Sequence, residues 1–359
     1  VRYISFFEDD DFSYIVLELM DGNLEDYLSE STIDATQATI LCKDVIMGLE
    51  FLHEQNILHR DLKPRNILYK ERPKPRLKIA DFGLSRKVDS KCTTVYGTGV
   101  GTRCWIAAEV LTSKTNNVDK DRFGQLSDMF SCGLILHYIL SEQKHPFSPT
   151  DCSNKSEIQI CNETETNIIK GKMEGWNTTL SPEASHLIIR MLETNEKNRP
   201  SAQEVLEHPL FWSGQKKIDL LQAVGNQKEF QCPRSKRKPP LTMVETDLEK
   251  MFGVIVKHGS WINPSYKYMP HIYTQMTGGR GRKNYVTSSA VELVRFIRNV
   301  YQHYKDNSFV LPVAMEQMLF NDFVFLGYFP DLLMEVYQVI TTHGWDKTKD
   351  DIKSIMNRN

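Results

Sequence analysis

Apolar and polar positions along the chain predict strands near its start and helices further on. Residues Val1 to Leu17 form two apolar runs joined by an acidic turn at 8–11, which predicts a β-hairpin. Residues 38–53 have the spacing of a helix, and a strand–turn–strand unit follows at 67–80. Helical spacing dominates after residue 212, so the fold is predicted to be α+β, mostly α. The helical spacing is visible at Val291, Val294 and Ile297, and again at Leu332, Val336 and Ile340.

Length and composition are those of an ordinary soluble protein. The 359 residues suggest two domains at roughly 150 residues each. With 40% apolar residues, 25% charged residues and a net charge of -2, the chain is not expected to be disordered, collagenous or fibrous. Its longest apolar stretches, around 132–140 and 323–329, fall well short of the ~18–20 residues of a transmembrane helix. No membrane contact is therefore predicted within this chain.

Cysteine usage favours a reducing, cytoplasmic location. The seven cysteines are odd in number and show no C-x-x-C spacing, so neither a disulfide framework nor a zinc site is predicted.

Charge is divided unevenly between the two halves. Residues 213–359 hold 20 Lys and Arg against 14 Asp and Glu, or +6, which leaves 24 against 32, or -8, for residues 1–212. The basic second half favours a polyanionic partner, although so small an excess is also typical of a solvated surface.

Two motifs in the first half point to phosphoryl transfer. Residues 59–66 read HRDLKPRN, and Asp81-Phe82-Gly83 begins 20 residues after Asp61. Together they resemble the catalytic loop and magnesium-binding motif of a protein kinase. Lys63, two positions after Asp61, resembles the serine/threonine type. Because this octet and tripeptide occur together, the match is far more specific than either motif alone.

The resemblance implies a role for each polar residue and a nucleotide cofactor, ATP or ADP. Phosphoryl transfer depends mostly on positioning and charge stabilisation. Asp61 would orient the attacking hydroxyl, and Lys63 would neutralise charge on the transferred group. Asn66 and Asp81 would supply oxygen ligands to Mg²⁺.

Further residues extend the resemblance to the end of this half. Residues 101–109 look like the end of an activation segment, with Ala108 where the family usually has proline. Glu109 would form a buried ion pair with Arg199, and Asp128 would brace the catalytic loop. The stretch 200–212 resembles the closing helix of a kinase large lobe.

The same resemblance assigns the first residues to the nucleotide cleft. The hairpin would be the last one of the small lobe, with Glu18-Leu19-Met20 as the hinge. Backbone groups of Glu18 and Met20 would meet the adenine edge, with Leu17 at the mouth of the back pocket. A glycine-rich loop and a V-A-I-K lysine are not found before it. We therefore expect a large lobe with only the last small-lobe hairpin, and little or no kinase activity from this chain.

A second group of polar residues lies in the helical half. Arg298, Asn299 and His303 fall on a helix predicted to begin near 288 or 289, and Tyr285 precedes it. Asn299 and His303 are four residues apart and share a helix face. By themselves such residues are usually surface polar groups. Their placement after a kinase lobe, together with residues 329–333 and Tyr337, resembles the kinase-extension nuclease domain.

That domain occurs in the inositol-requiring kinase/endoribonuclease of the unfolded-protein response and in ribonuclease L. The resemblance implies metal-independent RNA cleavage by a ribose 2'-hydroxyl, with no cofactor, on stem-loop or single-stranded RNA. His303 would be the general acid because histidine titrates near neutrality. Tyr285 would be the base or a phosphate-positioning hydroxyl. Arg298 would bind the phosphate, and Asn299 would hold the scissile geometry.

The implied organisation is a nucleotide-gated homodimer, joined through its kinase and nuclease domains, that phosphorylates itself. We expect a kinase domain at 1–212, the nuclease domain at 213–345 and a C-terminal tail at 346–359. The parent protein would lie in the endoplasmic reticulum membrane with this part facing the cytosol, or be a soluble ribonuclease L relative. Two alternatives remain: a serine/threonine kinase, in its full-length form, whose C-terminal helices only dock partners, and a pseudokinase scaffold.

Overall fold

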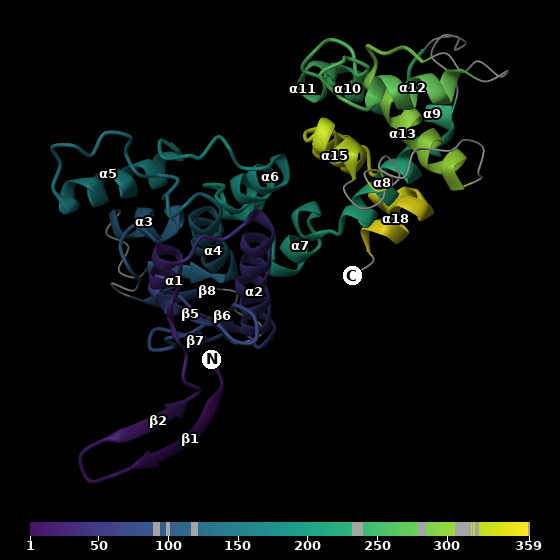
Figure 1. Cartoon of the computed structure of the whole chain (residues 1–359). Helices are drawn as coiled ribbons and strands as arrows, with labels where there is room; N and C mark the ends of the chain where they lie inside the picture. Colours follow the sequence, from purple (N-terminus) through teal and green to yellow (C-terminus); the bar gives the residue numbers. More distant parts are fainter. Residues whose placement is uncertain are drawn as a thin grey trace. The chain divides into compact units, whose positions relative to one another are not determined.

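Two separate apolar cores organise the chain. The computed structural model describes residues 1–88, 94–97, 101–115, 121–231, 240–278, 285–305, 317, 319 and 323–357. The residues divide into one unit from Val1 to Phe211 and a second from Trp212 to Asn359 (Figure 1). Each unit has its own cluster of buried apolar side chains.

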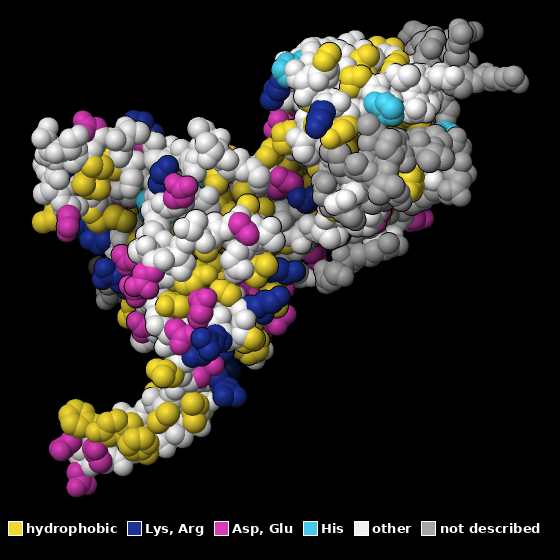
Figure 2. Space-filling model, in the orientation of Figure 1, with side chains coloured by type: hydrophobic (Ala, Val, Ile, Leu, Met, Phe, Trp, Pro, Cys, Tyr) yellow, Lys and Arg dark blue, Asp and Glu magenta, His cyan; other side chains and the backbone are white. Residues whose placement is uncertain are grey.

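The first unit begins with the predicted β-hairpin. Strands β1 (Tyr3–Glu8) and β2 (Ser13–Leu17) pair antiparallel, with Phe6 opposite Ile15. The hairpin projects from the body of its unit, and its apolar side chains are open to solvent (Figures 1 and 2). Phe6 is 50% exposed and Ile15 65% exposed, although they lie on paired strands.

The short strands that follow the hairpin in the sequence form three small sheets. The first has the order β3–β5–β6, and the predicted strand–turn–strand unit supplies its β5 and β6. The other two are the antiparallel pairs β4–β7 and β8–β9. Their bounds are β3 Gly22–Asn23, β4 Ile57–Leu58, β5 Ile67–Lys70, β6 Arg76–Ile79, β7 Arg86–Lys87, β8 Thr94–Gly97 and β9 Asp121–Gly124.

Helices α2 (Ala35–Glu54) and α4 (Gln125–Leu140) pack together at the centre of this unit. The apolar face predicted for α2 is buried, and Leu41, Val45 and Leu49 have no exposed surface. Gly133 lets α4 approach α6, because a Cβ there would lie 2.9 Å from the Met191 Cβ. The other helices are α1 Leu24–Glu30, α3 Ala108–Thr115, α5 Glu157–Lys170, α6 Pro182–Met191 and α7 Ala202–Leu206, with 3-10 turns at Pro64–Asn66, Glu196–Asn198 and Pro209–Phe211.

The closing helix predicted at 200–212 is divided. Helix α7 ends at Leu206, and a separate 3-10 turn begins at Pro209. Proline has no N–H to continue the helix and clashes with the preceding turn, so it starts a new element.

Every regular element in the described part of the second unit is a helix. Helix α13 (Ala290–Lys305) lies against α8 (Gly214–Gly225), α9 and α10. The apolar positions predicted at helical spacing on α13 and α16 are all buried. Among the helices described, none combines the length and apolar character needed to cross a bilayer. The others are α9 Lys228–Gln231, α10 Met243–Lys250, α11 Phe252–Ile255, α12 Met269–Thr277, α15 Val324–Tyr328, α16 Leu332–Thr342, α17 Trp345–Thr348 and α18 Asp350–Met356.

Most of the segment 346–359, which was expected to be a C-terminal tail, is helical. Residues up to Met356 form α17 and α18, and α18 packs against α8. Ile352 has no exposed surface, and Trp345 is 7% exposed. Trp345 and Ile352 belong to the apolar core of this unit, so they anchor the two short helices on it.

A buried ion pair joins the start of α3 to the loop before α7. Arg199 donates to both carboxylate oxygens of Glu109, at 2.9 and 2.7 Å, as the sequence predicted. It also donates to the carbonyls of Leu126 and Glu193, and its guanidinium lies 4.8 Å from the Phe130 ring centroid. The Arg199 side chain is fully buried, so Glu109 depends on it for charge compensation.

We expect Arg199→Ala to lower the free energy of unfolding of the first unit by about 3–5 kcal/mol, because it leaves a carboxylate uncompensated. Arg65→Ala is the matched control, since Arg65 pairs with Glu25 at the surface and water screens that pair. Urea denaturation followed by circular dichroism measures both. Equal midpoints for the two variants would contradict the assignment.

Candidate active sites

The first candidate site lies at one end of the β5–β6 hairpin. Ile67 pairs with Ile79, and the Ala80 N–H donates to the Asn66 carbonyl at 2.9 Å. This pairing places Asp81 one residue beyond the position opposite Asn66. The Asn66 amide nitrogen donates to the backbone carbonyl of Asp61 at 2.8 Å and to its carboxylate at 3.0 Å. The fold thus gathers Asp61, Asn66 and Asp81, which are up to 20 residues apart in sequence.

The Asp61 carboxylate is the centre of a hydrogen-bond network. Lys63 donates to Oδ2 at 2.9 Å, and Thr102 donates to Oδ1 through its N–H at 2.8 Å and its hydroxyl at 2.7 Å. Lys63 also donates to the Thr102 hydroxyl at 2.6 Å. Burial by itself would raise the pKa of Asp61, but the hydrogen bonds from Thr102 and Lys63 outweigh it, so the pKa is lowered. Asp61 is therefore an ionised acceptor at neutral pH.

Asp128 holds the backbone of the loop that carries Asp61. Its carboxylate accepts the N–H groups of His59 and Arg60, both at 2.9 Å, and lies 3.3 Å from the His53 Nε2. The His59 ring contacts the Ala80 carbonyl at 2.9 Å, which joins the loop to the end of β6. Asp128 is 2% exposed, so these bonds replace its lost hydration. The predicted brace is confirmed.

Asp81 and Asn66 have the chemistry of a magnesium pair. Asp81 is exposed and takes a left-handed backbone with φ of 60°, which Asp tolerates better than most residues. Both hydrogen bonds described for the Asn66 side chain use its nitrogen, so its carbonyl oxygen lies outside them. No group of three or more His, Cys, Asp or Glu in the described ranges could hold a metal. Mg²⁺ fits the two oxygens because it keeps waters and phosphates as its other ligands.

Of the three residues predicted to line the nucleotide cleft, Leu17 ends strand β2, and Glu18 and Met20 follow it. Leu17 is 48% exposed. The Glu18 N–H donates to the Arg2 carbonyl at 2.9 Å, and its carboxylate is held by Lys78 at 2.6 and 2.8 Å. Met20 is half-buried. The Glu18 backbone carbonyl takes part in none of these hydrogen bonds, so it could accept one from the edge of an adenine.

The second candidate site is a chain of hydrogen bonds between α13, α8 and the segment before α13. The Asn299 amide nitrogen donates to the Tyr285 hydroxyl at 2.9 Å, and Arg298 donates to the Asn299 carbonyl oxygen at 2.8 Å. The Arg298 Nε donates to the Asn226 side chain at 2.6 Å. Asn226 follows the last residue of α8 and is exposed, whereas Tyr285 and Asn299 are buried. Three of the four predicted nuclease residues are thus tied together.

Aromatic rings and a cation surround Tyr285. The Phe296 ring stands perpendicular to it with centroids 5.1 Å apart, and the Arg295 guanidinium lies 4.4 Å from its centroid. Trp261 and Tyr273 complete the enclosure at 6.1 and 6.2 Å. Burial is the main influence on the Tyr285 pKa and raises it, although Asn299 and Arg295 act in the opposite direction. Tyr285 therefore stays protonated at neutral pH.

His303 lies one helical turn after Asn299 on α13 and is half-buried. The spacing puts both side chains on one face of the helix, as the sequence predicted. The neighbouring basic residues Arg282 and Lys283 lie outside the described residues.

Four residues of these sites could not be identified by the sequence motifs. Thr102 was seen only as part of an activation segment. Asn226 followed a helical stretch, where it resembles an ordinary helix end. Arg295 falls on the apolar face of α13, three positions before Arg298. Gly225 is required because a Cβ there would lie 2.7 Å from the Arg298 Cβ.

Comparison with known protein families identifies both units. The family model described as protein kinase domain matches residues 1–211, and the one described as ribonuclease 2-5A matches residues 217–353.

Curated relatives contain the same combination of domains. Serine/threonine-protein kinase/endoribonuclease IRE1a of Arabidopsis thaliana is 31% identical over 311 residues, which cover 84% of this chain and 33% of that protein. The IRE1 protein of Oryza sativa subsp. japonica is 30% identical over 370 residues, covering 97% and 38%. The "Sensor for unfolded proteins in the ER ire1" of Schizosaccharomyces pombe is 29% identical over 380 residues, covering 95% and 32%. The chain spans about a third of the length of each.

The chain therefore belongs to the protein kinase family, and the ribonuclease 2-5A domain after its kinase domain makes it a member of the IRE1-type kinase/endoribonucleases.

Proposed function

We propose that the second unit is an endoribonuclease that cleaves RNA by attack of a ribose 2'-hydroxyl on the adjacent phosphate. The observation that carries this proposal is the hydrogen-bonded chain Tyr285–Asn299–Arg298–Asn226. It runs from the buried Tyr285 and Asn299 to the exposed Asn226 within a ribonuclease 2-5A domain, and His303 lies one helical turn after Asn299 on α13.

Arg298 is positioned to bind the phosphate. Its Nε is bound to Asn226 and its NH1 to Asn299, which fixes the plane of the guanidinium. The second terminal nitrogen lies outside these two bonds. A guanidinium fixed in this way offers a donor to phosphate oxygens and stabilises charge that develops in the transition state.

Tyr285 acts in this proposal as a phosphate-positioning hydroxyl rather than as the base. Its oxygen accepts from Asn299, so its own proton is available to donate. Its raised pKa disfavours the tyrosinate that a general base would require. Asn299 links this hydroxyl to Arg298 and sets the distance between the two donors.

The attacking 2'-hydroxyl loses its proton to solvent water, and His303 is the general acid that protonates the departing 5'-oxygen, which leaves a 2',3'-cyclic phosphate on the other fragment. Imidazole suits this step because its charge changes near neutral pH. RNA is the substrate, as stem-loop or single strand, and DNA is not cut because it lacks the 2'-hydroxyl. The proposed reaction uses no metal or cofactor.

The alternative, a helical module that only docks partners, fits the interior less well. Tyr285 and Asn299 place a hydroxyl and an amide among buried apolar side chains such as Phe296. Burying such groups is costly, and a scaffold could fill the same space with apolar residues. A catalytic site needs these polar groups.

For the first unit we propose serine/threonine kinase chemistry with ATP or ADP. Asp61 orients the attacking hydroxyl, Lys63 stabilises the transferred phosphoryl group, and Asn66 with Asp81 holds Mg²⁺, which neutralises the nucleotide phosphates. Leu17, Glu18 and Met20 line the adenine side. The β1–β2 hairpin belongs to the small lobe, since an exposed apolar two-stranded hairpin is seldom stable alone and is expected to join a larger sheet.

The two activities are coupled through self-association. Nucleotide in the kinase cleft favours a homodimer that forms through both units, and the protein is its own phosphorylation substrate. The Schizosaccharomyces pombe relative is named as a sensor in the endoplasmic reticulum. We accordingly place the kinase and nuclease units on the cytosolic face of that membrane, in unfolded-protein-response signalling.

Asn299→Ala and His303→Ala should each lower the rate of stem-loop RNA cleavage by about 10²–10⁴-fold, because Asn299 holds Arg298 and Tyr285 in position and His303 protonates the leaving oxygen. Gel electrophoresis of labelled RNA measures the rate, and circular dichroism checks folding. His343→Ala is the matched control, because it removes an imidazole that pairs with Asp247 in the same unit. Undiminished cleavage by both site variants would sink the proposal.

Tyr285→Phe should lower the cleavage rate uniformly between pH 6 and 9 without changing the shape of the profile. The Tyr285 pKa is raised from its ordinary value near 10, so the hydroxyl stays protonated across this range and contributes equally throughout. A general base would instead give wild-type activity an increase with pH that the variant loses. Rates measured across buffers at constant ionic strength separate the two roles.

A further inference from the structure

Two cysteines that are distant in sequence meet beside the first candidate site. Cys104 lies in the segment just before α3, and Cys161 lies on α5. Their sulfur atoms are 2.6 Å apart, and the Cys104 sulfur is also 3.7 Å from the Cys161 carbonyl oxygen. Both residues are thiols of intermediate exposure. A disulfide bond is about 2.05 Å long, so only a small movement separates the contact from a bond.

Independent contacts hold the Cys104 segment against α5. Arg103 donates to both carboxylate oxygens of Glu165, at 3.1 and 2.6 Å, and to the Asn162 side chain at 2.6 Å. The ring of His145 donates to the Cys104 carbonyl at 3.0 Å. Burial lowers the pKa of His145 to about 4, so the imidazole remains neutral. These bonds fix both sides of the cysteine.

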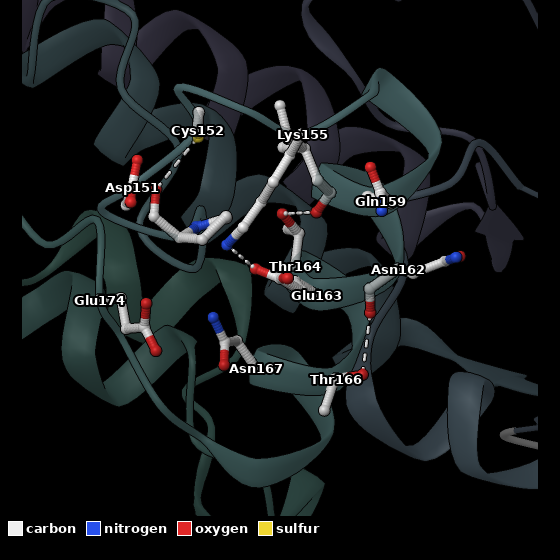
Figure 3. A network of polar contacts seen from close by, with 12 residues as sticks. Asp151, Cys152, Lys155, Gln159, Asn162, Glu163, Thr164, Thr166, Asn167 and Glu174 are labelled. Atoms are coloured by element: carbon white, nitrogen blue, oxygen red, sulfur yellow. Dashed lines mark hydrogen bonds and ion pairs between the residues drawn. The ribbon is translucent and has the colours of Figure 1, made fainter.

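Helix α5 is anchored in turn to its own unit. Figure 3 shows the polar side chains around it, including the ion pair of Lys155 with Glu163. Asn167 donates to the Phe147 carbonyl at 3.0 Å. Cys161 is therefore presented by a fixed helix rather than by a free loop.

The backbone at Cys104 supplies a second observation. Its φ of 68° lies in the left-handed region, where a residue with a side chain is uncommon and strained. Glycine would occupy this position at little cost. The side chain present there is a thiol aimed at another thiol.

We propose that Cys104 and Cys161 are a modification site at which a hydroperoxide forms a reversible intramolecular disulfide. One thiol is oxidised by the peroxide to a sulfenic acid, with release of one water. The second thiol then attacks that sulfur, the S–S bond forms, and a second water leaves. In balance, two thiols and one hydrogen peroxide give one disulfide and two waters; a dithiol reductant reverses the reaction.

Disulfide formation at this site should be slower than at the reactive cysteines of redox sensors. Burial, together with the contact to Cys161, raises the pKa of the Cys104 thiol. Little of it is thiolate at neutral pH, and the thiolate is the reactive form. Bond formation is therefore expected to accelerate as the pH rises from 7 to 9.

The disulfide would affect the catalytic loop, because Cys104 lies close to a residue that binds Asp61. Thr102, two residues before Cys104, provides two of the hydrogen bonds to the Asp61 carboxylate. A covalent link from Cys104 to α5 would restrain this segment and keep Thr102 on Asp61. The inference concerns the thiols alone and stands whether or not the proposed nuclease function is correct.

The test treats the full chain with hydrogen peroxide, alkylates it under denaturing conditions and maps its peptides without reduction. We expect one cross-linked peptide pair containing Cys104 and Cys161, lost after dithiothreitol. The bond closes a loop of about 57 residues, so the first unit should also melt about 5–10 °C higher until reductant is added.

Cys161→Ser should abolish both the cross-link and the melting shift. The exposed Cys152 is nearby in sequence, and Cys152→Ser should leave both unchanged. If Cys161→Ser does not fold, the wild-type peptide map decides by itself. The proposal would be overturned if the Cys104 thiol can still be alkylated under conditions that have already oxidised Cys152. It would also be overturned if Cys104 forms a disulfide with a different cysteine.

Discussion

The second site depends on how closely α8 and α13 pack at Gly225. The backbone of α8 passes so near to the Arg298 side chain that a single Cβ would collide with it. That approach brings Asn226, immediately after the helix, within hydrogen-bond distance of Arg298. Arg298 is then held on two sides, and Asn299 is held with it. A larger residue at position 225 would separate the helices and release the guanidinium, so the polar chain is a consequence of one close helix contact.

The first site uses a related principle in which a buried carboxylate organises a loop. Asp128 binds the loop without a described hydrogen bond to Asp61 itself: its carboxylate accepts the N–H groups of His59 and Arg60, the two residues before Asp61. The loop that carries Asp61 therefore has its backbone fixed from below, while Lys63 and Thr102 fix its carboxylate. In both units a functional side chain is oriented by hydrogen bonds with neighbouring polar residues, and Asp128 and Asn299 among these are buried.

Sequence patterns predicted the elements that follow a strong period or motif. The hairpin at the start, helix α2, the β5–β6 unit and helix α13 were predicted correctly. The apolar spacing of α2 and α13 reflects one buried face, whereas the hairpin was identified by its two apolar runs and the acidic turn between them, although its side chains are exposed. The octet at 59–66 and the tripeptide at 81–83 located Asp61, Asn66 and Asp81 before any geometry was known. Glu109 and Arg199 were also paired correctly across 90 residues.

Sequence could not supply contacts between elements. The roles of Thr102 and Asn226 depend on the residues that they bind, and the sequence around each of them does not indicate which residues those are. Arg295 occupies an apolar position of α13, where its stacking on Tyr285 depends on a ring from another segment. The helices at 345–356 were missed because short charged helices carry little periodic signal and are stabilised by packing on α8.

The central claim is that the second unit cleaves RNA with its own side chains. Incubation of the full chain with a stem-loop RNA, ADP and Mg²⁺, followed by identification of the new ends by mass spectrometry, tests this claim directly. The expected ends are a 2',3'-cyclic phosphate on one fragment and a 5'-hydroxyl on the other. Fragments with 3'-hydroxyl and 5'-phosphate ends would contradict it, because a ribose 2'-hydroxyl would then not be the attacking group.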